Sequence, residues 1–218
     1  MKLVHDVIRG YQEHHLLLGE KIDGKLSDFS SIWESKDEEK ALKELLFCIL
    51  TPQSRAQVCW GAVENMACND ILLKGTYDEV LGSLEKVRFK YRKSGFLIEA
   101  RNRFYRDGRI NIIEFIKGFD DALSAREWFV RNIKGFGYKE SSHFLRNIGL
   151  GDDLAILDRH ILRELAKVGV IMEIPGSMSN RKYLDIEERM RGFSKNINIP
   201  LLHLDLVIWH MATGTIFK

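Results

Sequence analysis

Apolar residues recur with helical spacing through almost the whole chain, and this periodicity limits the available folds more than any other feature of the sequence. The first stripe ends before Pro52, because a proline cannot continue the helical hydrogen-bond ladder. Only three prolines occur in 218 residues, and alternating β-branched runs are few. The sequence therefore predicts an all-α fold of about ten helices. The stripes lie at Leu42 to Leu50, Ser54 to Met66, Leu97 to Tyr105, Ala122 to Ile133, Ser141 to Ile148, Ile161 to Val168, Tyr183 to Met190 and Leu204 to Met211.

The composition is that of an ordinary globular protein, with 45% hydrophobic and 29% charged residues. Charged and histidine side chains interrupt residues 1–18, and no run reaches the length of a membrane span. We therefore expect a cytoplasmic protein with no membrane segment. The three cysteines, Cys48, Cys59 and Cys68, form no CxxC pair, and the histidines form no His-x3-His pair. The sequence thus predicts reduced thiols and no protein-bound metal.

Positive charge is concentrated in one stretch, although the net charge of the chain is only +2. Between Arg88 and Arg109, eight basic residues stand against two acidic ones, with five aromatic residues among them. Such a mixture suits contacts with phosphates and stacking on unpaired bases. The alternative is an amphipathic helix whose aromatic side chains face the core and whose basic side chains face water. The sequence leaves both interpretations open.

The most informative segment is Ile133-Lys134-Gly135-Phe136-Gly137, which separates two amphipathic helices. Two glycines around one apolar residue predict a tight turn, and they leave backbone N–H groups accessible to a phosphate. Such a turn would anchor DNA without reading its sequence. The alternative is an ordinary helix C-cap followed by a short connector.

Lys139 falls in the first turn of the second of these helices. The positive end of the helix dipole disfavours the ammonium form there, and attack on a sugar carbon requires the neutral amine. Asp158 follows nineteen residues later, and the chain after Gly149 is long enough to return beside Lys139. Asp158 also suits the N-cap of the next helix, a role that would hold its carboxylate in place. The alternatives are a solvated surface lysine and an aspartate that only caps.

This combination resembles the helix-hairpin-helix DNA glycosylases, with their glycine-rich hairpin, lysine nucleophile and assisting aspartate. Residues 130–165 are similar to the archaeal-type 8-oxoguanine DNA glycosylase/lyases, and the similarity extends over most of the chain. Lys134 stands where many superfamily members have proline, but the archaeal-type members share this lysine. Members with an iron–sulfur cluster need four C-terminal cysteines, whereas all three cysteines here precede residue 70.

The resemblance implies two helical subdomains with a cleft between them. Residues 41–150 would form the central subdomain, with the helix-hairpin-helix at about residues 123–148, and residues 1–40 together with 151–218 would form the second. The implied activity is excision of 8-oxoguanine from double-stranded DNA followed by β-elimination at the abasic site. Lys139 would attack the sugar C1′, and Asp158 would stabilise the positive charge that develops on the sugar.

Further site residues follow from the same resemblance. Gly135, Gly137 and Lys134 would contact the DNA backbone, and hairpins of this family often hold a monovalent cation, although no cofactor or catalytic metal is needed. Four more residues would contact the damaged base or the base opposite it, and core packing is the alternative for two of them, Phe89 and Trp209. For Lys218, the alternative is a frayed chain end. These four residues are Arg88, Phe89, Trp209 and Lys218.

Three questions stay open at the level of sequence. His143, Asp205 and His210 are further candidates for the base pocket, but they are equally compatible with structural roles. A helix-hairpin-helix glycosylase of another base specificity is the first alternative function, and a non-enzymatic DNA-binding module is the second. We expect a monomer, because one chain supplies all the named groups.

Overall fold

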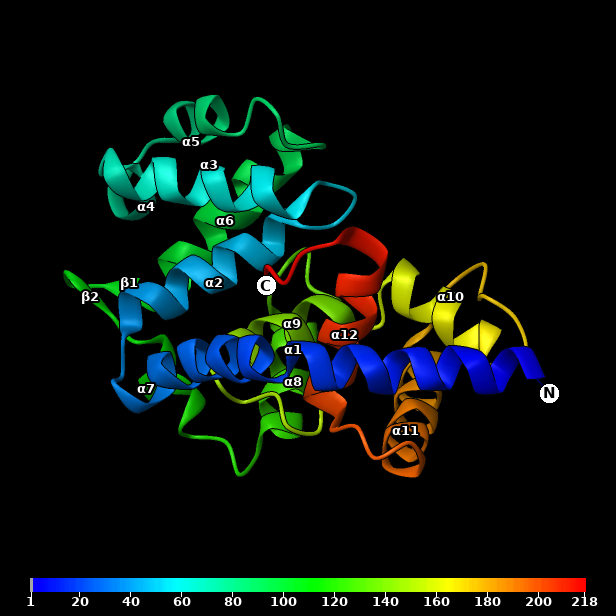
Figure 1. Cartoon of the computed structure of the whole chain (residues 1–218). Helices are drawn as coiled ribbons and strands as arrows, with labels where there is room; N and C mark the ends of the chain where they lie inside the picture. The colour runs from blue at the N-terminus through cyan, green and yellow to red at the C-terminus, as the bar shows by residue number, and fades with distance from the viewer. Residues whose placement is uncertain (1) are drawn as a thin grey trace.

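Figure 1 shows the computed structural model, which describes residues 2–218 and is almost entirely helical. Twelve helices and one two-stranded antiparallel hairpin occur in this range, so the all-α prediction is confirmed. The helices outnumber the expected ten because α4 and α7 span only 4 and 5 residues, too few to show a period. The elements are α1 (Lys2–Glu34), α2 (Glu38–Leu50), α3 (Ala56–Cys68), α4 (Ile71–Lys74), α5 (Tyr77–Ser83), α6 (Lys90–Phe104), β1 (Tyr105–Arg106), β2 (Arg109–Ile110), α7 (Ile112–Ile116), α8 (Ala122–Asn132), α9 (Tyr138–Asn147), α10 (Arg159–Lys167), α11 (Asn180–Asn196) and α12 (Leu201–Thr213).

The small hairpin of β1 and β2 was not expected from the periodicity. Asp107 and Gly108 connect the strands, and both have positive φ, at 51° and 76°. An Asp-Gly pair is favoured in two-residue hairpin turns, because these require φ above zero at both central residues. The local signal was therefore present in the sequence, but the strands are only two residues long.

Polar side chains fix where several helices begin. The Asp37 side chain accepts a hydrogen bond from Lys40 N at 3.0 Å at the start of α2, and Asp121 accepts one from Ser124 N at 2.7 Å at the start of α8. Each of these side chains satisfies one of the N–H groups that the first turn of a helix leaves unpaired. The starts of these helices are thus fixed by contacts within the first turn.

The buried hydrophobic residues form two groups, and α1 and α9 contribute to both. The first group gathers α2 to α8 and includes Ile32 of α1 and Phe144 of α9. The second gathers α10, α11 and α12 and includes Ile22 of α1 and Tyr138 of α9. In Figure 1, α3 to α6 lie together on one side, while α10 and α11 lie at the other end beside α12. The predicted boundaries at residues 41 and 150 stay a prediction.

A buried ion pair connects the two groups. The guanidinium of Arg126 in α8 donates to both carboxylate oxygens of Glu187 in α11, at 2.6 and 2.9 Å, and both side chains are almost fully buried. Two parallel hydrogen bonds fix the relative orientation of the partners as well as their distance. The pair therefore ties the helix before the glycine hairpin to a helix of the second group.

The glycine-containing segment forms the predicted helix-hairpin-helix from α8 and α9. Gly135 has φ of 84°, and a Cβ atom at this position would come within 2.9 Å of the Phe96 ring. Phe136 between the glycines is 7% exposed and packs near Phe129 and Phe144. The turn thus needs glycine for its backbone conformation, while its apolar residue anchors it in the core.

None of the helices in residues 2–218 combines the length and apolarity needed to cross a lipid bilayer.

Candidate active site

A cavity of ≈ 860 Å³ lies where α9, α10 and α12 meet the chain between α2 and α3. Its size falls in the usual range for small-ligand pockets. Five of the predicted site residues line it, and they come from five separate parts of the chain. These residues are Arg88, Lys139, Asp158, Trp209 and Lys218.

Lys139 occupies the first turn of α9, as predicted, and its side chain is 26% exposed at the cavity. Its Nζ lies 3.1 Å from Oε1 of Glu140. The second oxygen of Glu140 accepts a hydrogen bond from Gly137 N at 3.1 Å. One carboxylate therefore closes the glycine hairpin and holds the lysine amine. Glutamate at the third position of a helix is typical of a capping box, so the local sequence contains the signal for this contact.

Asp158 caps α10 by accepting a hydrogen bond from Ile161 N at 2.8 Å, so its predicted capping role is confirmed. The segment before it is held tightly: Ala155 N donates to Glu187 at 2.9 Å, and the Tyr183 hydroxyl donates to Ala155 O at 2.6 Å. The same hydroxyl accepts a hydrogen bond from Leu157 N at 3.3 Å. Glu187, which also pairs with Arg126, thus fixes the segment that carries Asp158 and positions its carboxylate at the cavity.

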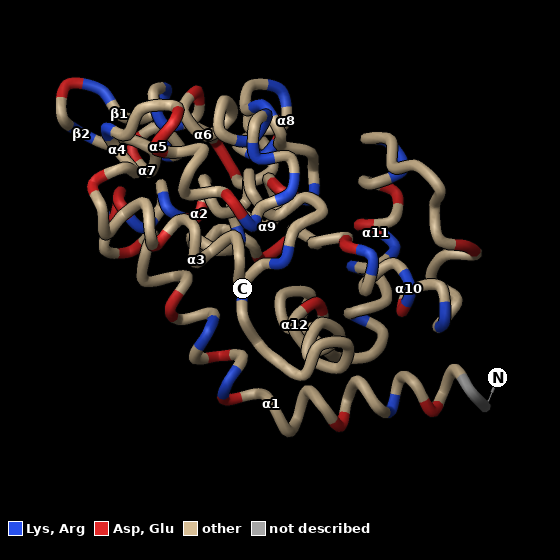
Figure 2. The backbone as a smooth tube through the Cα atoms, turned by 90° about the horizontal axis from the view of Figure 1, so that it is seen from above, with Lys and Arg blue, Asp and Glu red and all other residues tan. Residues whose placement is uncertain are grey.

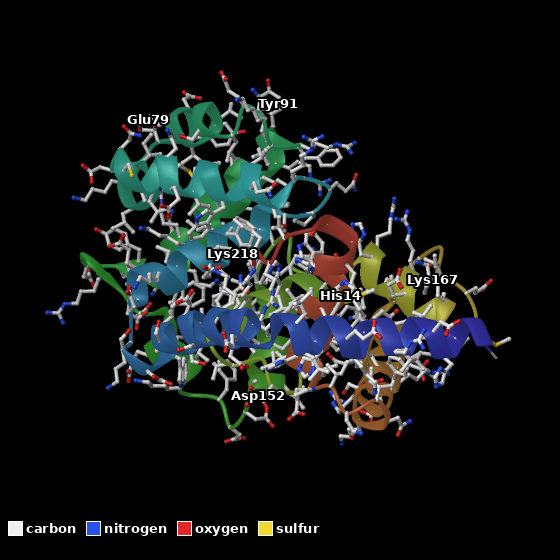
Figure 3. The ribbon with its side chains drawn as sticks, in the orientation of Figure 1. His14, Glu79, Tyr91, Asp152, Lys167 and Lys218 are labelled. Carbon is white, nitrogen blue, oxygen red and sulfur yellow. The ribbon has the colours of Figure 1, made fainter. Side chains whose placement is uncertain are left out.

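Lys218 turns its ammonium away from solvent and into the molecule, as Figure 3 shows at its centre. Nζ forms an ion pair with Glu44 and lies 3.4 Å from the centre of the Trp60 ring. Burial lowers the pKa of Lys218, and Glu44 opposes that shift. The ammonium therefore forms an internal ion pair, because a buried cation needs a nearby anion, and a contact between Lys218 and a flipped base stays a prediction. Lys218 also lines the cavity.

A chain of buried polar groups continues from this pair. Asn147 donates to Glu44 at 2.8 Å and accepts from Arg146 at 3.0 Å. Arg146 in turn pairs with Asp205 at 3.3 Å. This network joins α2, α9, α12 and the last residue of the chain. Apart from the neighbours Arg146 and Asn147, its members lie far apart in the sequence, and no local motif predicts that they meet.

The hairpin residues lie beside the large cavity rather than on its wall. Gly137 lines a second, smaller cavity that shares Lys139 with the first. Lys134 is 63% exposed and pairs with Glu99 at 2.8 Å. Its ammonium and the accessible backbone around Gly135 are available to a polyanion, while the lysine amine of Lys139 faces the cavity.

The basic stretch from Arg88 to Arg109 contains both buried and exposed side chains, so neither interpretation of the sequence applies to all of it. Lys93 is 5% exposed and donates to the backbone oxygens of Leu50 and Pro52 at 2.7 and 2.8 Å, which holds the loop after α2. Phe89 is 51% exposed, so the core interpretation is wrong for this residue. Its backbone has φ of 60°, and the Arg88 guanidinium lies 5.3 Å from its ring.

Charges of both signs are interspersed along α1, α10 and α11 in Figure 2, rather than sorted into one basic face. Within residues 2–218, no three His, Cys, Asp or Glu side chains are grouped so as to hold a metal ion.

Comparison with known proteins identifies the family that shares this sequence and fold. A family model described as 8-oxoguanine DNA glycosylase matches residues 22–199. The chain belongs to the 8-oxoguanine DNA glycosylase family. Within this family, the 8-oxoguanine DNA glycosylase/AP lyase of Fusobacterium nucleatum is 44% identical over 194 residues, which cover 89% of each chain. The corresponding protein of Methanocaldococcus jannaschii is 42% identical over 199 residues, or 90% of this chain and 91% of that one.

Solved structures of the 8-oxoguanine DNA glycosylase family share the fold. The crystal structure of the Methanocaldococcus jannaschii 8-oxoguanine DNA glycosylase superposes with a TM-score of 0.87 and 39% identity, covering 98% of this chain and 97% of that one. A second structure, of the Methanocaldococcus jannaschii glycosylase/lyase with a 15mer DNA containing 8-oxoguanine, also has a TM-score of 0.87 at 38% identity. It covers 97% of this chain and 99% of that one.

Proposed function

We propose that this chain excises 8-oxoguanine from double-stranded DNA and then cleaves the strand at the abasic site, with Lys139 as the nucleophile. The observation that carries the proposal is the placement of Lys139 and Asp158 on one cavity beside the glycine hairpin. Family membership supports the choice of lesion, because the relatives are 8-oxoguanine DNA glycosylase/AP lyases. The damaged nucleotide leaves the duplex to reach the cavity.

The chemistry requires a neutral amine and an anion near the sugar. The Lys139 amine attacks C1′, and the bond from C1′ to the base breaks with its electron pair leaving on the base, which takes up a proton. Asp158 stabilises the positive charge that develops on the sugar. The amine then gives up its protons, the C1′–O4′ bond breaks, and O4′ takes up a proton, so the sugar ring opens and leaves an imine between Nζ and C1′. Removal of a proton from C2′ expels the 3′ phosphate, which completes the β-elimination and nicks the strand.

Other predicted contacts follow from their positions. Gly135, Gly137 and Lys134 anchor the DNA backbone next to the nucleophile. Phe89 and Arg88 occupy the space near the base opposite the lesion, because the exposed Phe89 ring follows Arg88, which lines the cavity, and can stack on an unpaired base. A monovalent cation at the hairpin, a monomeric state and a cytoplasmic location stay predictions.

Borohydride trapping on a duplex with one 8-oxoguanine tests the nucleophile. We expect wild-type protein to form a covalent adduct, and Lys139→Gln to lose both the adduct and base excision while keeping duplex affinity. Lys167→Gln is the matched control, because this exposed lysine of α10 pairs with Glu164 away from the cavity. An adduct in Lys139→Gln would overturn the assignment.

The same assay separates the alternative functions. A non-enzymatic DNA-binding module would form no adduct with any duplex. A glycosylase of other specificity would trap on duplexes with an oxidised pyrimidine or an alkylated purine in preference to 8-oxoguanine. We expect preference for 8-oxoguanine in such a panel.

A further inference from the structure

Three side chains on the cavity wall carry buried polar atoms that make no hydrogen bond within residues 2–218. The unpaired atoms are the two ring nitrogens of His143, Oδ1 of Asp205 and Nε1 of Trp209. Buried polar groups in folded proteins nearly always have partners, so a cluster of exceptions on one cavity points to a ligand. His143 is the clearest member, because it is 7% exposed and neither of its nitrogens makes a hydrogen bond of acceptable geometry in the described chain, although the backbone of Lys218 lies near the ring.

The position of His143 on α9 relates it directly to Lys139. Residues four apart on a helix share a face, and they are separated by about 6 Å along the axis. Both side chains line the same cavity, so a nucleoside whose C1′ lies at the amine can extend its base along the wall that His143 forms. The ring of His143 is supported from behind by Phe47, edge to face at 5.5 Å between centroids.

The surroundings of His143 favour its neutral form. Burial lowers the pKa of His143 well below its usual value, and the positive charges of Arg146, Lys139 and Lys218 act in the same direction. The backbone of Lys218 opposes this shift, and it is the weakest influence. A neutral imidazole presents one N–H donor and one acceptor nitrogen, whereas lysine and arginine side chains only donate. His143 therefore adds an acceptor to a wall that is rich in cationic donors.

We propose that His143 is a base-contacting specificity residue, whose unprotonated ring nitrogen accepts a hydrogen bond from an N–H group of the extruded purine. This inference rests on the proposed glycosylase activity and extends it to recognition of the base. His143 takes no part in forming the imine. Its effect is therefore confined to substrates that still carry a base.

Two variants and two substrates test the proposal. His143→Phe keeps an aromatic ring against Phe47 but removes both nitrogens, and His143→Asn keeps a donor and an acceptor. We expect His143→Phe to slow single-turnover excision of 8-oxoguanine by about 10- to 100-fold, the effect of losing one hydrogen bond. Cleavage of a preformed abasic site should stay within about twofold of wild type, because that substrate has no base to bind. His143→Asn should restore part of the lost excision rate.

The control is His203→Phe, since this partly buried histidine of α12 contacts His15 and does not line the cavity. It should leave both reactions unchanged. The proposal is overturned if His143→Phe excises 8-oxoguanine at the wild-type rate, if it loses both reactions equally, or if His143→Asn is as slow as His143→Phe. A wild-type protein that excises no base would instead contradict the proposed function, whatever the variants do.

Discussion

The Asp158 carboxyl group combines a structural and a chemical requirement at one position. It caps α10 through Ile161 N, and it lines the same cavity as Lys139. A capping residue is held in one orientation, so the carboxylate needs no reorganisation when charge develops on the sugar. The first role follows from the local sequence, whereas the second depends on where the chain returns after α9.

Substitution of Asp158 by Asn separates these two roles. Asparagine caps a helix about as well as aspartate, but it has no negative charge. Asp158→Asn should therefore unfold at nearly the same urea concentration as wild type, while single-turnover excision falls by about 10²- to 10³-fold. Ser179→Asn, at the N-cap of α11, is the control and should change neither quantity. Excision by Asp158→Asn at a nearly wild-type rate would leave Asp158 as a cap only.

At the scale of elements, the α8–α9 hairpin depends on one backbone conformation. Gly135 lies in the left-handed region, and its Cα hydrogen faces the Phe96 ring. Any side chain here meets both a strained φ and a close contact. Gly135 therefore tolerates substitution less well than a glycine inside an exposed helix.

A pair of glycine substitutions tests this difference. Gly135→Ala should lower the free energy of unfolding by about 1–3 kcal/mol, because alanine is strained at this φ and its Cβ crowds Phe96. Gly192→Ala in α11 should raise it by about 0.5–1 kcal/mol, since a Cβ there meets no neighbouring atom within 4 Å. Urea unfolding measures both. Equal stability of Gly135→Ala and wild type would contradict the requirement for glycine.

At the scale of the whole molecule, buried charges hold the helices around the cavity. The Arg126–Glu187 pair joins the two hydrophobic groups, and the network from Lys218 to Asp205 joins α2, α9 and α12. Removing one partner of a buried pair strands the other charge, so these contacts specify the arrangement strongly. They also make stability depend on pH.

Asp205 makes a contribution to the free energy of unfolding that changes with pH in a predictable direction. Burial raises the pKa of Asp205 to about 6, from 3.8, although Arg146 opposes the shift. Between these values the folded protein keeps a proton that the unfolded chain has lost, so the contribution of Asp205 to the free energy of unfolding falls as pH rises. Asp205→Asn does not titrate. Its stability relative to wild type should therefore increase from about pH 4 to about pH 6, by on the order of 1–3 kcal/mol.

Urea unfolding of both proteins over this pH range measures the difference. Asp185→Asn, at an exposed position of α11 that pairs with Arg189, serves as the control. It should show a much smaller change with pH, because solvent screens exposed pairs. A difference between Asp205→Asn and wild type that does not vary with pH would contradict the buried titration.

The sequence by itself determined the helical class, the glycine hairpin, the position of Lys139 at a helix start and the cap at Asp158. Each of these depends on residues within a few positions of one another, through helical periodicity, backbone conformation or capping. Short-range rules of this kind act wherever the segment lies. The similarity to known glycosylases extended this reading to the lesion and to the pairing of Lys139 with Asp158.

Only the tertiary structure decided which distant side chains meet. It placed Glu44 against Lys218 and left His143 without a hydrogen-bond partner on the cavity wall within the described chain. It also buried Lys93 while exposing Phe89, against the usual preference of a cation and an aromatic ring. These outcomes depend on burial, on partners more than thirty residues away and on which wall of a cavity a helix face meets. None of these is encoded in local spacing.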